Sequence, residues 1–326
     1  MVIFFIAKGT GTNRPVNRKD ETMEYVFTCK ELGKKYGNFS ALTGMNMEIP
    51  KGAIYGFVGK NGAGKTTLIR LLCGLQQPTS GSFELMGIAN NNKDIVNARR
   101  RMGAVVEAPA IYKDLNARSN LIQQCLMLGL PDFDKVDELL TLVGLSDTGK
   151  KKAGKFSLGM RQRLGLAIAL CGDPDFIILD EPTNGLDPQG IIEIRELIIK
   201  LNKEKGITFL ISSHILDELA RMATHYGFID KGHIVRQMSS EELRSECRKS
   251  VRIKVNDTKI LAKVLENLGV EYKILDDNTA DMYAEMTFSE LAKKCEEAGC
   301  TIMTMEEHDE SLEAFYLSLL GGADNA

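Results

Sequence analysis

The sequence lacks an apolar run long enough to cross a membrane. A membrane-spanning helix needs about 20 consecutive apolar residues, and the longest run here, LGLAIALCG at residues 164–172, is about half that length. The chain also lacks a basic excess, because its 41 lysines and arginines are balanced by 44 acidic residues, which gives a formal net charge of −3. We therefore expect no membrane insertion by this chain itself and no binding to nucleic acid.

Paired cysteines are also missing. The seven cysteines are odd in number and form no CxxC pair. Cys73 and Cys171, for example, lie inside apolar or helical stretches. Free thiols in a reducing cytosol are the simplest interpretation.

The first residues carry no secretory signal. The opening MVIFFIA is too short for the apolar core of such a signal, and no basic residue precedes it. The segment that follows is polar. We predict that residues 1–22 form a disordered extension, with a misplaced start of the chain as the alternative.

The remaining residues have the composition of a globular protein large enough for one large domain and a smaller one. In residues 23–238, strand-like segments occupy 25–59, and residues 93–155 favour helices. Short apolar strands then alternate with helical patterns, which predicts an α/β domain with a parallel sheet covered by helices. In residues 239–326 the order becomes strand, helix, two strands, helix, strand, which predicts a ferredoxin-like α+β domain with a last helix at 311–322.

A glycine-rich stretch, GKNGAGKTT at residues 59–67, matches the pattern of a phosphate-binding loop. An apolar strand precedes it and a helical stretch follows it, as the motif requires. Glycines let backbone N–H groups approach phosphate oxygens closely, the lysine adds a charge for the β and γ phosphates, and the next threonine offers a hydroxyl to Mg²⁺. The predicted phosphate-binding residues are Gly59, Asn61, Gly62, Ala63, Gly64, Lys65, Thr66 and Thr67.

Two adjacent acids end a second apolar strand, FIILDEP at residues 176–182. Neighbouring residues of a strand face opposite ways, so the two acids can have different tasks. We predict that Asp180 binds Mg²⁺, directly or through water, and that Glu181 accepts a proton from the attacking water. A solvated strand end is the alternative, and the phosphate loop in the same chain favours the catalytic interpretation.

The stretch GKFSLGMRQRLGLAIALCG at residues 154–172 predicts a second anion-binding helix end. Ser157 and Gly159 lie at the start of a long amphipathic run, where backbone N–H groups are free to hold an anion. One nucleotide does not obviously need two such helix ends. Taken alone, the stretch is also consistent with an ordinary helix N-cap.

The motifs of residues 25–238 resemble, in the same order, those of the nucleotide-binding subunit of ATP-binding cassette (ABC) transporters. FSLGM, followed by RQR, stands at the signature position of that family, with Ser157 and Gly159 on its serine and second glycine; Leu158 and Met160 depart from its commonest residues. The resemblance implies a P-loop NTPase fold with a parallel core sheet, an antiparallel β subdomain and an α-helical subdomain. It also implies two cassettes packed head to tail, each signature helix capping the γ-phosphate that the other's loop holds.

The resemblance implies roles for three further residues. Asp187 in NGLDP is expected to lie between the two sites of a dimer, although a plain turn closed by Pro188 fits the same residues. His214 in ISSHILDE is expected to act in catalysis by reaching the γ-phosphate. Tyr36 in KKYGNFSAL is expected to stack on adenine, with a core aromatic as the alternative.

Glu107 in MGAVVEAPAIY departs from the family pattern, which usually has a glutamine that reaches Mg²⁺ and the attacking water. A glutamate keeps the oxygen ligand for Mg²⁺ and ATP and adds a negative charge. An acid in this loop resembles the bacitracin and lantibiotic export branch, which also tends to carry an appended C-terminal domain. A solvated loop acid is equally consistent with the residue.

The resemblance implies a cytoplasmic ATPase that binds ATP and Mg²⁺ and forms a dimer with a second ABC subunit, simplest as a homodimer. It also implies that the dimer drives a separate membrane-spanning permease at the inner face of the cell membrane. The expected process is export of, or immunity to, a peptide antibiotic.

Three other classes compete with this interpretation. A cassette protein of translation would carry two cassettes per chain, and this chain has one phosphate loop. A DNA-repair ATPase would insert long coiled coils between its motifs, and the ~90 residues between Lys65 and Ser157 hold no extended heptad pattern. A regulatory protein with inactive motifs is the third, and the intact Lys65, Asp180, Glu181 and His214 argue against it.

Overall fold

The computed structural model describes residues 24–130, 133–247, 250–284 and 286–308, together with 312, 315, 316 and 319. Contacts divide the chain into two compact units, one ending at Ser240 and the other beginning at Glu241. The predicted extension at 1–22 and most of the predicted last helix lie outside the described residues.

Six strands form the central sheet of the first unit, in the order β10-β9-β3-β8-β7-β6. Their bounds are β3 Ile54–Val58, β6 Met102–Val105, β7 Phe176–Asp180, β8 Thr208–Ser213, β9 His225–Asp230 and β10 His233–Ser239. All neighbouring pairs are parallel except β10 with β9. The strands β3, β7 and β8 are buried at every residue, as parallel strands covered on both faces are. The predicted parallel sheet is confirmed.

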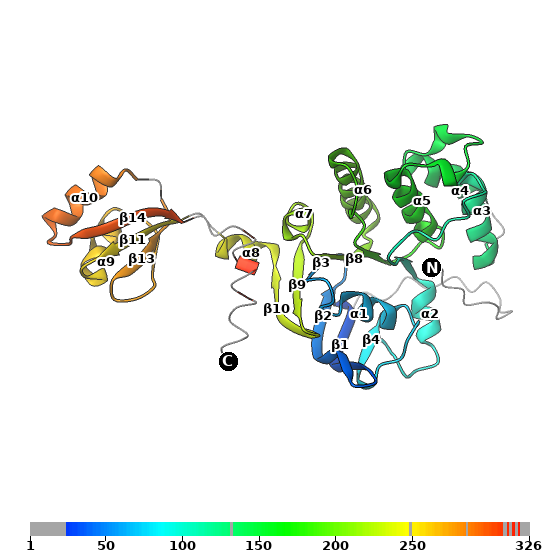
Figure 1. Cartoon of the computed structure of the whole chain (residues 1–326), viewed down its shortest axis with the longest axis horizontal. Coiled ribbons are helices and arrows are strands. Elements are labelled where there is room, and N and C mark those ends of the chain that lie inside the picture. Colours follow the sequence, from blue (N-terminus) through cyan, green and yellow to red (C-terminus); the bar gives the residue numbers. More distant parts are fainter. Residues whose placement is uncertain are drawn as a thin grey trace. The chain divides into compact units, whose positions relative to one another are not determined.

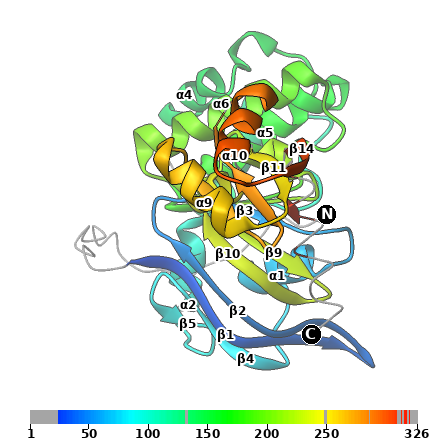
Figure 2. The same cartoon turned by 90° about the vertical axis from the view of Figure 1, so that its left-hand side faces the viewer.

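A second, antiparallel sheet has the strand order β2-β1-β4-β5. Its strands are β1 Tyr25–Tyr36, β2 Phe39–Pro50, β4 Ser80–Leu85 and β5 Ile88–Ala89. Helix α1, Lys65–Leu72, follows β3, and α2, Ile95–Arg100, precedes β6. Within this unit, Figures 1 and 2 show the antiparallel sheet on one side of the core sheet and α4, α5 and α6 on the other.

The helical side of the unit is built from five α-helices and two 3₁₀ turns. They are α3 Ala117–Leu128, α4 Asp134–Leu142, η1 Ser146–Thr148, η2 Ala153–Lys155, α5 Leu158–Leu170, α6 Pro188–Lys205 and α7 Leu216–Ala220. The expectation of an amphipathic run after Ser157 was wrong, because α5 has no single apolar face. It packs against β6, α3, α4 and α6 at once, so it needs apolar residues around much of its circumference.

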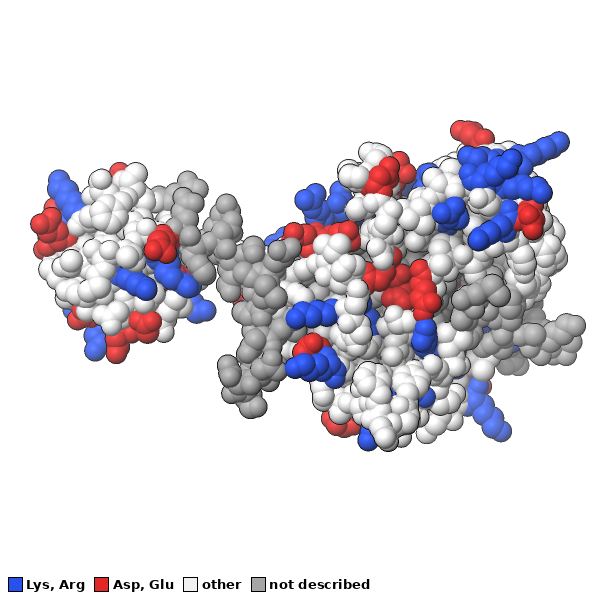
Figure 3. Space-filling model, in the orientation of Figure 1, with Lys and Arg blue, Asp and Glu red and all other residues white. Residues whose placement is uncertain are grey.

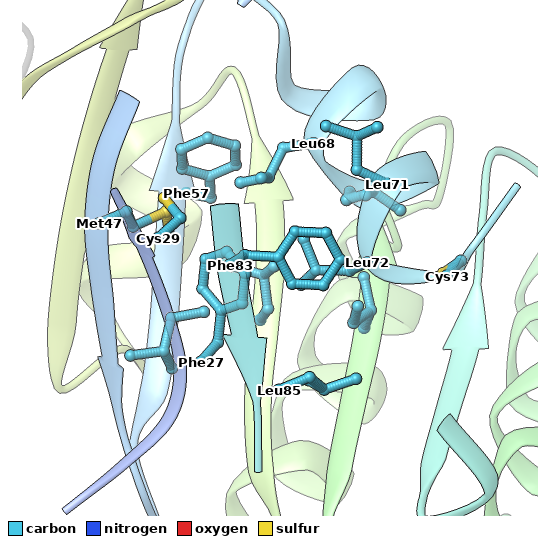
Figure 4. Packing of buried hydrophobic residues seen from close by; sticks show 14 of the residues in the cluster. Phe27, Cys29, Met47, Phe57, Leu68, Leu71, Leu72, Cys73, Phe83 and Leu85 are labelled. Carbon is cyan, nitrogen blue, oxygen red and sulfur yellow. The ribbon is translucent and has the colours of Figure 1, made fainter. Parts of the chain in front are cut away.

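One hydrophobic core joins the two sheets of the first unit through α1. Leu68, Leu71 and Leu72 of α1 are fully buried and belong to the same hydrophobic cluster as Phe27 and Phe83 of the antiparallel sheet (Figure 4). Apolar packing therefore fixes α1, the helix that follows the phosphate loop, in place. No cysteine forms a disulfide in the part of the chain that the structure describes, and burial raises the pKa of Cys73, in this core, to about 12.

The second unit contains a four-stranded sheet with the order β12-β13-β11-β14. Its elements are β11 Ser250–Val255, α9 Thr258–Asn267, β12 Tyr272–Ile274, β13 Thr279–Met282, α10 Phe288–Glu297 and β14 Ile302–His308, after the short helix α8 Ser240–Glu246. Every neighbouring pair is antiparallel. This element order and strand order are those of a ferredoxin-like domain. No helix in the described part of either unit is both long and apolar enough to span a membrane.

The contact between β6 and α5 makes a testable demand on Gly103. A Cβ atom added there would lie 2.4 Å from the carbonyl oxygen of Ala169, and a backbone atom cannot move aside cheaply. We expect Gly103→Ala to lower the free energy of unfolding by about 2 kcal/mol. In the control Gly172→Ala the nearest atom would be 3.6 Å away, so little change is expected. Equal denaturant midpoints for the two variants would contradict this packing.

Candidate nucleotide-binding site

The loop between β3 and α1 forms one wall of a cavity of about 450 Å³, a volume suited to a small ligand. The residues that line the cavity are Phe39, Ala41, Lys60, Asn61, Gly62, Gly64, Lys65, Thr66, Thr67, Glu107, Asp180, Glu181 and Asn184. Most of the predicted phosphate-binding residues are among them. Gly59 and Ala63 belong to the same loop but do not line the cavity, and Ala63 is buried.

Gly64 is required by the close packing of the loop. Its φ is +114°, and a Cβ atom there would lie 2.7 Å from the carbonyl oxygen of Ala41. Both the backbone conformation and the space exclude other residues. Gly62 also has a positive φ, +83°, but a Cβ atom added there would meet no other atom within 4 Å, so this side of the residue faces open space in the cavity.

Lys65 is almost fully buried and folds back over its own loop. Its Nζ donates to the carbonyl oxygen of Gly59 at 2.5 Å and lies 3.2 Å from Oε1 of Glu181. The contact with Glu181 is an ion pair without hydrogen-bond geometry, because Oε1 is buried and has no hydrogen-bond donor among the described residues. That carboxylate oxygen is an acceptor that a water molecule or a ligand could satisfy.

Asp180 is held by two hydroxyl groups at the end of β7. Thr66 Oγ1 donates to Oδ2 at 3.0 Å, and Ser212 Oγ of β8 donates to Oδ1 at 2.5 Å. Burial raises the pKa of Asp180, and the two hydroxyl hydrogen bonds act in the opposite direction. Ser212 was not anticipated from the sequence, although it precedes the predicted His214 in the same strand end.

Glu181 adopts a backbone conformation that non-glycine residues rarely take, with φ of +49°. Its N–H donates to the carbonyl oxygen of Ser212 at 3.2 Å, which fixes the residue beyond the end of the strand. Its Oε2 lies 2.8 Å from Nδ1 of His214. The structure thus brings Lys65, Thr66, Asp180, Glu181 and His214 to one edge of the sheet.

Glu107 lines the cavity and forms an ion pair with Arg70 of α1, which was also not anticipated. Its φ of +61° turns the backbone sharply after β6. Both side chains remain accessible, at 54% for Glu107 and 39% for Arg70. Glu107 is therefore neither a buried acid nor an unpaired one.

The aromatic side chain that lines the cavity is Phe39, not the predicted Tyr36. The Tyr36 hydroxyl donates to Oε1 of Gln76, and Nζ of Lys34 lies 5.3 Å from the centre of its ring. Phe39 is 62% exposed, which is unusual for a large apolar side chain. Phe39 lies beside Ala41 and the phosphate loop in the lining of the cavity, and Tyr36 does not.

Ser157, Gly159 and Asp187 do not line this cavity. Ser157 is the N-cap of α5 and accepts a hydrogen bond from the N–H of Met160 at 3.2 Å. Asp187 is the N-cap of α6 and accepts from the N–H of Gly190 at 3.0 Å. Each side chain has a capping role within its own chain.

The family follows from comparison with known proteins. Residues 42–184 match the ABC transporter family. The chain is 39% identical over 305 residues to the bacitracin transport ATP-binding protein BcrA of Bacillus licheniformis, covering 92% of this chain and 99% of that protein. The chain belongs to the ABC transporter family. It is an ATP-binding subunit of that family and an ATPase whose hydrolysis of ATP is coupled to transport.

Further relatives agree with this assignment. The lantibiotic transport ATP-binding protein SrtF of Streptococcus pyogenes is 45% identical over 206 residues, covering 63% of this chain and 87% of that protein. Among solved structures, CbiO1 of Clostridium perfringens, part of the ABC transporter complex CbiONQ, superposes with a TM-score of 0.63 at 27% identity over 76% of this chain and 97% of that one. The predicted α/β P-loop NTPase fold and the resemblance to the bacitracin and lantibiotic branch are confirmed.

The exposure of the Arg70–Glu107 pair makes a prediction about stability. Because both side chains reach solvent, Glu107→Gln and Arg70→Gln should each change the free energy of unfolding by less than about 1 kcal/mol. Arg252→Gln is the contrast, because it removes a bidentate partner from Asp281, whose side chain is only 8% exposed. Urea denaturation of the three variants checks this, and a loss for Glu107→Gln as large as that for Arg252→Gln would contradict it.

Proposed function

We propose that this chain binds MgATP in the cavity beside the phosphate loop, and that two copies form a dimer enclosing two nucleotides. The observation that carries the proposal is the group formed by Lys65, Thr66, Asp180, Glu181 and His214 at one edge of the sheet. Ser157 and Gly159 lie outside that cavity, so they are available to the nucleotide of a second copy.

The phosphates and Mg²⁺ fit the donors of the cavity. The backbone N–H groups of the loop and Nζ of Lys65 suit an anion, and the hydroxyl of Thr66 beside the carboxylate of Asp180 offers two oxygen ligands of the kind that Mg²⁺ prefers. Glu107 supplies a third oxygen at the cavity wall. When bound, Mg²⁺ offsets the negative charge of the β and γ phosphates.

Hydrolysis requires a group that takes a proton from the attacking water, and Glu181 suits that task. Its unsatisfied Oε1 faces Lys65, and its Oε2 is held by His214. A carboxylate positioned in this way can accept the proton, while His214 orients it and contacts the γ-phosphate. Phe39 and Tyr36 offer two aromatic faces near the loop for the base, and Phe39 is the one that lines the cavity.

The partner of the dimer in membrane transport is a separate permease. The relatives BcrA and SrtF are named as ATP-binding proteins of bacitracin and lantibiotic transport, and CbiO1 is part of a transporter complex. By analogy, this chain works in the cytoplasm at the inner face of the membrane, bound to that permease, and powers export of, or immunity to, a peptide antibiotic. The second unit, from Glu241 onward, is an accessory domain.

Replacement of Glu181 by glutamine tests the proposal. The phosphate ligands remain, so MgATP should still bind, but turnover should fall at least ~10²-fold because the proton acceptor is lost. A dimer should then accumulate and elute earlier than the monomer in size-exclusion runs with MgATP. Lys65→Ala is the control, since it should neither hydrolyse ATP nor dimerise. Normal turnover and an unchanged monomer peak for Glu181→Gln would remove Glu181 as the base.

A further inference from the structure

A cluster of exposed lysines lies directly before the signature helix α5. It consists of Lys113, Lys150, Lys151, Lys152 and Lys155. Lys113 comes from a segment distant in sequence from the other four. A backbone hydrogen bond joins the two segments, because the N–H of Gly154 donates to the carbonyl oxygen of Lys113 at 2.9 Å. In Figure 3, blue side chains gather over the connection between α4 and α5. We call these five residues the lysine patch.

The lysine patch is not neutralised by its surroundings. None of its members forms an ion pair with another residue in the described part of the chain. Its two segments contain only two acids, Asp114 and Asp147, both exposed. A local excess of positive charge therefore stands in a chain whose formal net charge is −3. Like charges held so close together repel one another and so destabilise the folded chain. A functional role would explain why this cost is tolerated.

The patch is fixed next to Ser157. Phe156, between Lys155 and Ser157, is only 3% exposed and anchors the segment in the core. Nζ of Lys151 lies 5.8 Å from the centre of the Phe156 ring. A charged group that approaches the N-terminus of α5 is therefore exposed to the positive electrostatic potential of the lysine patch.

The opposite charge reaches the cavity with its nucleotide. The lining carries Glu107, Asp180 and Glu181 against Lys60 and Lys65, and Arg70 pairs with Glu107, so the empty cavity is close to neutral. MgATP adds about two negative charges, because ATP carries about four negative charges and Mg²⁺ carries two positive charges. The cavity face thus becomes strongly negative only once nucleotide is bound.

We propose that the lysine patch of one copy attracts the nucleotide-loaded cavity face of a second copy and so speeds ATP-dependent dimerisation. This rests on the proposed function, in which Ser157 meets the partner's nucleotide. In a two-fold dimer the same pair of surfaces meets twice, so the attraction acts at both sites together. Electrostatic attraction of this kind raises the association rate more than the final affinity, and salt screens it over about 8 Å at physiological ionic strength.

The experiment uses the full chain carrying Glu181→Gln, in which the dimer is expected to persist. The patch variant adds Lys150→Gln, Lys151→Gln, Lys152→Gln and Lys155→Gln. The control adds the same loss of charge at exposed lysines elsewhere in the first unit, namely Lys93→Gln, Lys200→Gln, Lys203→Gln and Lys205→Gln. Stopped-flow light scattering after mixing with MgATP gives the association rate constant from about 20 mM to about 500 mM salt.

The parent and the control should associate faster at low salt, and the patch variant should be about tenfold slower there and nearly insensitive to salt. All three rates should converge at high salt. Thermal melts show whether the patch variant is folded. Equal rates and equal salt dependence for patch variant and control would overturn the proposal.

The outcomes also separate a failure of the lysine patch from a failure of the dimeric function. If the patch variant associates like the control yet loses binding to phosphatidylcholine vesicles that contain phosphatidylglycerol, the patch is a membrane-binding surface and the proposal is wrong. If the parent itself binds MgATP but never associates, the dimeric function fails and the proposal fails with it. If the parent associates and the patch variant associates at the same rate, the dimeric function stands and only the role of the lysines is overturned.

Discussion

The parallel pairing of β3, β8 and β7 is the constraint on which the site depends. Val58 of β3 lies opposite Ser213 of β8, and Asp180 of β7 lies opposite Ser212. The carboxyl ends of these strands therefore carry the phosphate loop, His214 and the acid pair to the same edge of the sheet. A shift of one residue in either pairing would turn Asp180 away from Thr66, because strand side chains alternate between faces.

Much of this arrangement could be predicted because the motifs are contiguous. A glycine-rich loop between a strand and a helix, and two acids at the end of an apolar strand, each specify local structure within a few residues. The partners of these residues could not be predicted. Ser212 reaches Asp180 across 32 positions of sequence, and Arg70 reaches Glu107 across 37. Such pairs depend on register and on side-chain direction, which a single sequence does not display.

The two aromatics near the loop illustrate the same limit. Tyr36 and Phe39 are separated by a turn in which Gly37 has a φ of +57°. The two residues are partners in the β1–β2 pairing, yet Phe39 lines the cavity, whereas Tyr36 contacts Gln76 and Lys34. Net charge was misleading in a similar way, because a total of −3 does not show that five lysines gather in one patch. Function in this chain follows from where charges are placed and not from their sum.

The central claim is that each ATP site is completed by a second copy, and trans-complementation tests it most directly. A Lys65→Ala chain lacks the phosphate loop's charge, and a Ser157→Arg chain blocks the signature helix, so neither should hydrolyse ATP alone. In the mixed dimer the intact loop of one faces the intact helix of the other, which restores one complete site. At equal amounts the mixture should recover roughly a quarter of the unmodified turnover, since about half of random encounters pair the two variants and each mixed dimer has one working site. A mixture no more active than its two components would contradict the account.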